Sequence, residues 1–180
     1  EALALAETMA PCVLWIDEIE KSMGQGNSDS DGGLSSRLFG SFLTWLQEKS
    51  EEVFVVATAN DLSKLPPELL RKGRFDEIFF VDLPDDQARL TIFQIQMMRH
   101  RQDPQRFDLT RLVLASDGFS GAEIEQVIIT ALYHALHEQC PVDTDLMEHT
   151  IKATVPLSVS RREDLKRLRA IAQNRFVSVK

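Results

Sequence analysis

The sequence predicts an α/β region followed by an all-helical region, with the change near Pro84. Three short runs, largely apolar, have the length of buried strands, at residues 12–16, 53–57 and 77–83. Because helical segments separate these runs, we expect them to form a parallel sheet that helices cover on both faces. After Pro84 the apolar residues recur only at helical spacing, so no further strand is expected.

The composition is that of a folded domain. Of the 180 residues, 43% are hydrophobic and 27% are charged, which is enough apolar material for a core. No apolar run approaches the length of a membrane span, and the first ten residues lack the basic start of a signal peptide. The two cysteines lie far apart and suggest neither a disulfide framework nor a metal site. We therefore expect a soluble, intracellular protein without membrane insertion.

The first region contains the predicted strands and two helices. Residues 1–10 are rich in alanine and leucine and predict a helix, which Pro11 ends because proline lacks a backbone donor. Residues 24–33 contain four glycines and no apolar residue, which is typical of a mobile surface loop. A helix after this loop is predicted by apolar residues spaced four apart, Leu34, Leu38, Phe42 and Leu46.

Helical periodicity dominates the second region. It predicts helices at 86–100, 121–139, 145–153 and 161–172. Two of these helices are expected to begin with a capping box, in which a hydroxyl and a carboxylate satisfy free backbone donors of the first turn. The expected pairs are Ser120 with Glu123 and Ser160 with Glu163.

Polar residues follow two of the predicted strands directly. Asp17 and Glu18 come after the first strand, and Asn60 comes shortly after the second. Ligands of parallel sheets bind beyond the carboxyl ends of the strands, where adjacent loops open a crevice. Adjacent carboxylates there can divide the work of nucleotide hydrolysis, one holding Mg²⁺ and the other activating water. An acidic pair after an apolar strand also occurs in α/β proteins without this chemistry, so the pair alone does not establish it.

A basic pair precedes the third strand. Arg71 and Arg74 lie three residues apart, with Gly73 between them to ease a tight chain path. A solvent-facing basic turn is the simpler interpretation of this pair. It does not explain why the same chain carries Asp17, Glu18 and Asn60 at separate strand ends.

Four segments in this order, CVLWIDE, VVATAN, ELLRKGRFD and GFSGAE, resemble the AAA+ ATPases that carry the second region of homology. The likeness is strong over residues 10–85 and 117–136. The chain looks closest to the AAA proteins of unassigned role encoded in cyanobacterial and plastid genomes. The resemblance implies a partial P-loop NTPase parallel sheet of Walker B, sensor 1 and arginine-finger strands, followed by an all-helical AAA lid. Residues 1–84 would be the C-terminal part of the large ATPase domain, and 85–180 the lid and a C-terminal helical extension.

The resemblance also implies roles for single residues. Asp17 matches the Walker B residue for Mg²⁺, Glu18 the residue that activates water, and Asn60 the first sensor. Arg71 and Arg74 match arginine fingers that reach into the nucleotide site of a neighbouring subunit. The remaining matches concern nucleotide binding, namely Gly121 and Ala122 of the second-sensor segment and Gln96, which stands where many relatives have a histidine.

The implied activity is hydrolysis of ATP with Mg²⁺ by a ring of identical subunits, which we expect to be a hexamer that remodels an unknown protein partner. The bacterial cytosol or the plastid stroma is the expected location. A nucleotide-sensing interaction module with little turnover is an alternative. A relative that loads onto DNA is a further alternative, although the net charge of -8 argues against nucleic acid as a partner.

One motif of the family is missing from the sequence. Nucleotide binding there needs a glycine-rich loop that ends in Lys-Ser or Lys-Thr, and no such loop occurs in these 180 residues. We therefore expect the chain to be the C-terminal portion of a longer protein and to be inactive alone. The phosphate-loop strand is central in the family's sheet, so the strands at 53–57 and 77–83 are expected to lack their shared neighbour.

Overall fold

The structure is a computed structural model that describes residues 2–23, 32–71, 73–173 and 176–179. Most of the predicted loop at 24–33 lies outside these residues. The chain divides into two compact units, Glu1–Ile78 and Phe79–Lys180, and each is described by itself. Within the described ranges, no helix is both long enough and apolar enough to cross a membrane.

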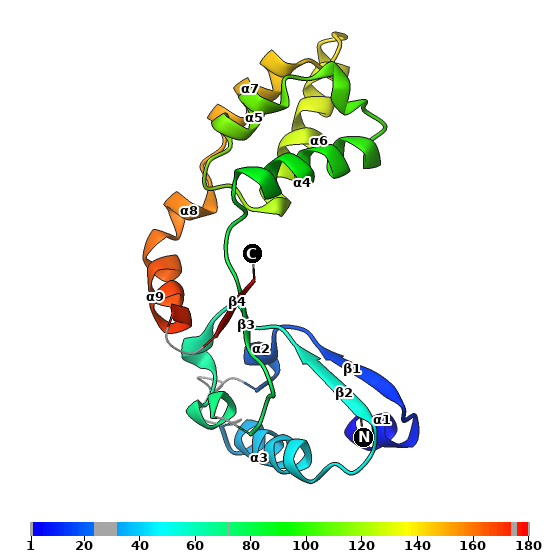
Figure 1. Ribbon diagram of the computed structural model, residues 1–180, viewed down its shortest axis with the longest axis vertical. Helices are drawn as coiled ribbons and strands as arrows, with labels where there is room; N and C mark the ends of the chain where they lie inside the picture. Colours follow the sequence, from blue (N-terminus) through cyan, green and yellow to red (C-terminus); the bar gives the residue numbers. More distant parts are fainter. Residues whose placement is uncertain (1, 24–31, 72, 174–175, 180) are drawn as a thin grey trace. The chain divides into compact units, whose positions relative to one another are not determined.

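The first unit is built around two parallel strands (Figure 1). Its elements in chain order are α1 (Ala2–Thr8), β1 (Cys12–Ile16), α2 (Ile19–Met23), α3 (Gly32–Glu48), β2 (Val53–Ala57), η1 (Leu62–Lys64) and η2 (Pro67–Leu70). Cys12 lies opposite Val53, and Ile16 lies opposite Ala57. The first two predicted strands are thus confirmed with their predicted bounds, and their carboxyl ends lie side by side.

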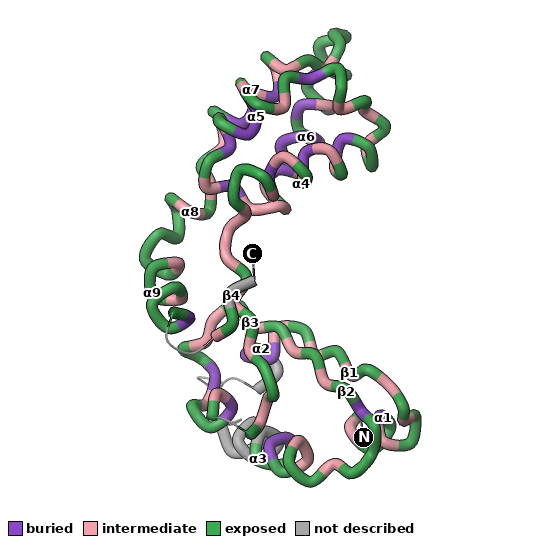
Figure 2. Tube along the Cα trace, in the orientation of Figure 1, coloured by how far each residue is buried: buried purple, intermediate pink, exposed green. Residues whose placement is uncertain are grey.

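One face of this sheet packs into a core and the other is exposed, which gives the strands their alternating burial (Figure 2). Ile16 and Ala57 pack against a cluster in which Phe42 and Leu69 are buried. Side chains of the opposite face are 40 to 69% exposed, namely Val13, Trp15, Phe54 and Val56. The expectation that helices cover both faces is therefore wrong for the described residues. A continuous apolar run makes both faces of a strand apolar without specifying what packs on them.

The second unit is mainly helical. Its elements are β3 (Phe79–Val81), α4 (Asp86–Arg99), η3 (Pro104–Arg106), α5 (Leu109–Ala115), α6 (Gly121–His137), α7 (Thr144–Ala153), α8 (Leu157–Ser160), α9 (Arg162–Gln173) and β4 (Val177–Val179). The four predicted helices correspond to α4, α6, α7 and α9, with ends that agree to within two residues. The short helices α5 and α8 and the strand β4 are not among the predicted elements.

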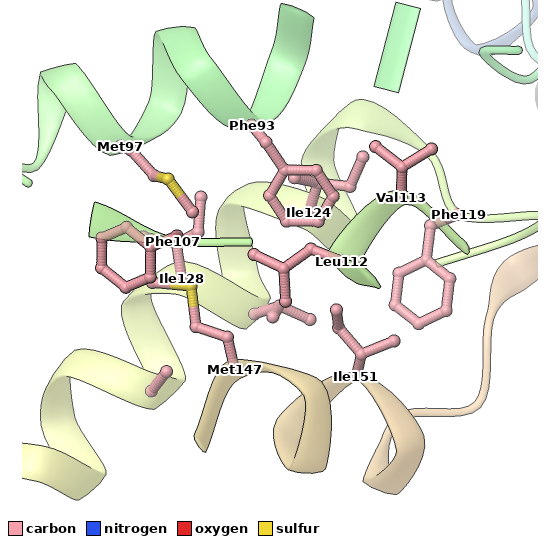
Figure 3. Packing of buried hydrophobic residues seen from close by; sticks show 12 residues of the cluster. Phe93, Met97, Phe107, Leu112, Val113, Phe119, Ile124, Ile128, Met147 and Ile151 are labelled. Carbon is pink, nitrogen blue, oxygen red and sulfur yellow. The ribbon is translucent and has the colours of Figure 1, made fainter. Parts of the chain in front are cut away.

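Helices α4, α5, α6 and α7 share one hydrophobic core (Figure 3). Phe93 and Met97 enter this core from α4, and Met147 and Ile151 enter it from α7. Leu112 of α5 lies between them. All five side chains are at most 1% exposed, so the four helices have a core that is independent of the first unit.

One of the two predicted capping boxes forms. Ser120 accepts from the backbone N–H of Glu123, whose carboxylate accepts from the N–H of Ser120 at 2.8 Å. The box expected at Ser160 is wrong, because Ser160 is already the last residue of α8. An N-cap residue needs a non-helical backbone, and Ser160 lies within a helix. Its hydroxyl donates to the carbonyl of Pro156 at 3.4 Å and so does not cap the first turn of α9. Glu163 pairs with Lys166 instead.

The C-terminal strand β4 pairs in parallel with β3, with Phe79 opposite Val177. Beside this pair, Nε and Nη2 of Arg169 each donate to one carboxylate oxygen of Asp82 at 2.9 Å. The predicted C-terminal helical extension thus ends in a strand that returns to β3. Among the described residues, β2 and β3 belong to separate two-stranded sheets.

Candidate functional site

Two backbone hydrogen bonds continue the β1–β2 pairing past the ends of the strands. The N–H of Thr58 donates to the carbonyl of Ile16 at 3.0 Å, and the N–H of Ile19 donates to the carbonyl of Thr58 at 2.9 Å. These bonds bracket Asp17 and Glu18. The residues that follow β1 are therefore held against the residues that follow β2, as the sequence predicts for parallel strands.

Thr58 joins the two acidic residues to β2. Its hydroxyl donates to Oδ1 of Asp17 at 2.5 Å and accepts from the backbone N–H of Glu18 at 3.0 Å. This fixes the direction of the Asp17 carboxylate while leaving the side chain exposed. Asp17 can therefore present an oxygen to a ligand without having to reorganise.

Both carboxylate oxygens of Glu18 are hydrogen-bonded. Oε1 accepts from Nδ2 of Asn60 at 3.0 Å, and Oε2 forms an ion pair with Nζ of Lys21 at 2.6 Å. The backbone of Glu18 has a φ of 48°, a left-handed conformation that costs a residue with a side chain roughly 1–2 kcal/mol. Strain of this kind is concentrated at functional sites, where the surrounding hydrogen bonds sustain it.

Sequence reasoning overlooked Glu20 and Lys21. Oε1 of Glu20 accepts from the backbone N–H of Asn60 at 2.9 Å, and Lys21 balances the acidic cluster. The hydrogen bond to Glu18, and then the charge of Glu18, raise the pKa of the Lys21 ammonium. A third carboxylate two positions after Glu18, in the first turn of a helix, was the signal available in the sequence.

The two arginines before β3 have different environments. Arg71 is exposed, and its side chain has no hydrogen bond or ion pair within the described part of the chain. Nη1 of Arg74 instead donates to the carbonyl of Leu43 in α3 at 2.8 Å. Gly73 between them has a φ of 91°, which agrees with the tight chain path predicted there.

The remaining predicted binding residues belong to the second unit. Gly121 and Ala122 form the first turn of α6, and Gln96 lies on α4, where its Oε1 accepts from Nη1 of Arg99 at 3.3 Å. A Cβ atom at Gly121 would meet Ile92 at 3.6 Å, an ordinary contact, so packing does not require glycine there. The structure therefore brings Asp17, Glu18 and Asn60 together within the first unit, whereas the roles of Gln96, Gly121 and Ala122 stay predictions.

The oxygens at the strand ends suit a hard cation such as Mg²⁺. This ion keeps several waters and is commonly held by one or two carboxylates together with substrate phosphates. The exposed Asp17 carboxylate, with the Thr58 hydroxyl behind it, fits that pattern. Among the described residues, no group of three or more histidine, cysteine, aspartate or glutamate side chains could hold a metal ion by itself.

Comparison with known proteins identifies both parts of the chain. Residues 1–83 match the family model "ATPase family associated with various cellular activities (AAA)", and residues 106–149 match the "AAA+ lid domain". Similar proteins in several organisms are named "Uncharacterized AAA domain-containing protein ycf46". The Pyropia yezoensis protein is 47% identical over 173 residues, which cover 96% of this chain and 35% of that protein.

Two further relatives carry the same name. The Guillardia theta protein is 44% identical over 169 residues, covering 93% of this chain and 33% of the relative. The Trieres chinensis protein is 42% identical over 175 residues, covering 97% of this chain and 35% of the relative. The chain thus spans about a third of the length of these relatives.

Proposed function

Because the chain belongs to the AAA family of ATPases, we propose that the native protein binds and hydrolyses ATP with Mg²⁺ in a ring of identical subunits. The ring, which we expect to be a hexamer, would couple hydrolysis to the remodelling of a protein partner. One observation carries this proposal. Asp17, Glu18 and Asn60 converge at the ends of two paired strands, with hydrogen bonds that fix each of them.

Asp17 has the position and chemistry to hold the metal ion. Bound Mg²⁺ would neutralise negative charge on the phosphates during transfer of the terminal phosphoryl group. The Thr58 hydroxyl donates to one oxygen of Asp17 and keeps the carboxylate in a single orientation. A preoriented ligand avoids reorganisation at the moment of reaction, which is the main source of electrostatic catalysis.

Glu18 would take a proton from the attacking water, while the amide of Asn60 holds the same carboxylate in place. General-base catalysis of this kind contributes about 10²–10⁴ in rate. Both oxygens of Glu18 accept a hydrogen bond in the structure, so the attacking water would approach a carboxylate that Asn60 and Lys21 already contact. The contact with Lys21 is the more easily exchanged, because the Lys21 side chain is 70% exposed.

Arg71 is the better candidate for a group that acts on a neighbouring subunit. It is exposed and without a side-chain partner among the described residues, whereas Arg74 is bound to Leu43 of its own chain. An arginine supplied across a subunit interface contributes about 10³–10⁵ in rate in phosphoryl transfer. An isolated subunit should then hydrolyse ATP very slowly.

A nucleotide-sensing module with little turnover is a second candidate function. It is favoured by the two contacts of Glu18, because Asn60 and Lys21 already occupy positions around the carboxylate that an attacking water would need. ATP binding together with a hydrolysis rate that does not rise with protein concentration would support this function over the first.

The test of the proposed function is the Glu18→Gln variant of the native polypeptide. We expect it to bind ATP with the affinity of the wild type and to lose at least about 10²-fold in turnover, because glutamine cannot accept the proton. Glu52→Gln, at an exposed position just before β2 and so at the opposite end of this strand from Asn60, is the matched control and should hydrolyse normally. Normal hydrolysis by Glu18→Gln would show that Glu18 does not activate the water.

A further inference from the structure

We propose that Glu20 is a positioning residue, which fixes the backbone of Asn60 so that the Asn60 amide reaches Glu18. This inference rests on the proposed function, because it concerns the same hydrolytic site. Glu20 belongs to α2, and Oε1 of its carboxylate accepts from the backbone N–H of Asn60 at 2.9 Å. The side chain of Asn60 donates to Oε1 of Glu18 at 3.0 Å. The two contacts form a continuous link from Glu20 through Asn60 to Glu18.

The burial of Glu20 distinguishes it from the other acidic residues of the site. Glu20 is 4% exposed, whereas Asp17 is exposed and the Glu18 side chain is 34% exposed. Its second oxygen, Oε2, is buried and has no hydrogen-bond partner among the described residues. Burying a carboxylate with incomplete hydrogen bonding destabilises a fold. Such a residue is expected where its chemistry serves a site more than it serves stability.

The loop that carries Asn60 is held at its other end by a separate contact. Asp61 caps η1, with its Oδ1 accepting from the N–H and the hydroxyl of Ser63. This contact fixes the chain after Asn60 but does not bond to the Asn60 peptide. Glu20 is the only partner of the Asn60 N–H among the described residues. Without it, the peptide between Ala59 and Asn60 can rotate, and the Asn60 side chain turns with it.

The kinetic test compares Glu20→Ala with Glu20→Gln in the native polypeptide. Loss of a hydrogen bond to a charged group should lower kcat about 10- to 100-fold in Glu20→Ala, with KM for ATP within about threefold. Glutamine keeps an acceptor oxygen, so Glu20→Gln should recover kcat to within about threefold of the wild type. Glu52→Ala, an exposed glutamate in the same unit, is the matched control and should leave kcat unchanged.

A double variant separates positioning from a structural role. If Glu20 acts through Asn60, Glu20→Ala should reduce kcat no further once Asn60→Ala is present, because the group that it positions is gone. Independent, multiplicative effects of the two substitutions would overturn the proposal. So would a Glu20→Ala variant that keeps wild-type kcat while Glu18→Gln is inactive, an outcome that leaves the proposed function standing.

Amide hydrogen exchange tests the contact without relying on hydrolysis. In Glu20→Ala, the Asn60 N–H should exchange at least about tenfold faster, while the N–H groups of Ile19 and Thr58 keep their protection. Unchanged exchange at Asn60, or loss of protection at all three, would overturn the proposal. If the wild type hydrolyses no ATP, the proposed function fails, and the exchange at Asn60 alone decides whether Glu20 fixes that peptide.

Discussion

The two units of the chain differ in how deeply their side chains are buried and in what those side chains contact. In the second unit, helices α4 to α7 bury a shared core, and its central side chains are fully enclosed. In the first unit, one face of the β1–β2 sheet is exposed, and polar side chains are hydrogen-bonded to one another at the strand ends. We infer that the first unit presents exposed polar groups at the ends of its strands, whereas the stability of the second unit comes from a core of its own.

Among variants that test this difference between the units, Arg71→Ala is expected to have the largest effect, on the rate of ATP hydrolysis. The substitution should lower ATP hydrolysis by about 10³-fold or more, since a positive charge at the transition state is lost. It should leave denaturant unfolding unchanged, because Arg71 is exposed and its side chain has no hydrogen bond or ion pair within the described residues. Arg74→Ala is the matched variant, and loss of its bond to Leu43 should destabilise by about 1 kcal/mol. Equal losses of stability in both variants would break the distinction between them.

The next largest effect concerns the core of the second unit. Leu112→Ala should lower the free energy of unfolding by about 2–5 kcal/mol, because Leu112 is 0% exposed and the substitution leaves a cavity. Leu114→Ala, on the same helix, should change it by less than about 0.5 kcal/mol, because Leu114 is 70% exposed. Chemical denaturation followed by circular dichroism measures both values. Similar changes in the free energy of unfolding for the two leucine variants would contradict the packing of α5.

A smaller effect is expected at the start of α6. Ser120→Ala removes the hydroxyl of the capping box and should destabilise the second unit by about 1 kcal/mol. Ser160→Ala is the control, because Ser160 caps no helix, and should change stability by less than about 0.5 kcal/mol. Thermal unfolding of the two variants gives the comparison. A larger loss of stability in Ser160→Ala than in Ser120→Ala would indicate that Ser160 caps a helix, as the sequence predicted.

The smallest effect is a dependence of the second unit's stability on acid. Hydrogen bonds from Lys152 and then Arg111 lower the pKa of Glu148. A lowered carboxyl pKa adds stability at pH values above its unfolded value of about 4.3, and this stability is lost as the pH falls through the folded value. Glu148→Gln should therefore reduce stability at pH 7 and flatten the decline below about pH 4. An unchanged acid limb would show that the ion pairs do not persist in solution.

Periodicity and motif spacing predict most of the regular structure. The apolar runs at 12–16 and 53–57 form β1 and β2, whose backbone N–H and C=O groups hydrogen-bond to each other. The helical spacing of apolar residues after Pro84 corresponds to α4, α6 and α7. The strand β4 was not predictable in this way. It is three residues long, and its pairing with β3 depends on a partner nearly a hundred residues earlier in the chain.

The candidate site is predictable in part. Asp17, Glu18 and Asn60 follow apolar runs, so the meeting of strand ends implies their proximity. The contact of Glu20 with the Asn60 N–H is not predictable, because it depends on how the first turn of α2 faces the loop after β2. Ser160 shows the opposite failure. Its spacing to Glu163 fits a capping box, but α8 begins after Pro156 and places Ser160 inside a helix.

The central claim is that Glu18 of one subunit acts together with Arg71 of its neighbour. Mixing the Glu18→Gln and Arg71→Ala variants of the native polypeptide tests it most directly, with differently tagged chains to confirm that they assemble together. Each variant alone should be inactive. In a random ring, about one interface in four joins an intact Glu18 to an intact Arg71, so roughly a quarter of the wild-type rate should return on mixing. Mixed rings that hydrolyse no more ATP than either variant alone would contradict the claim.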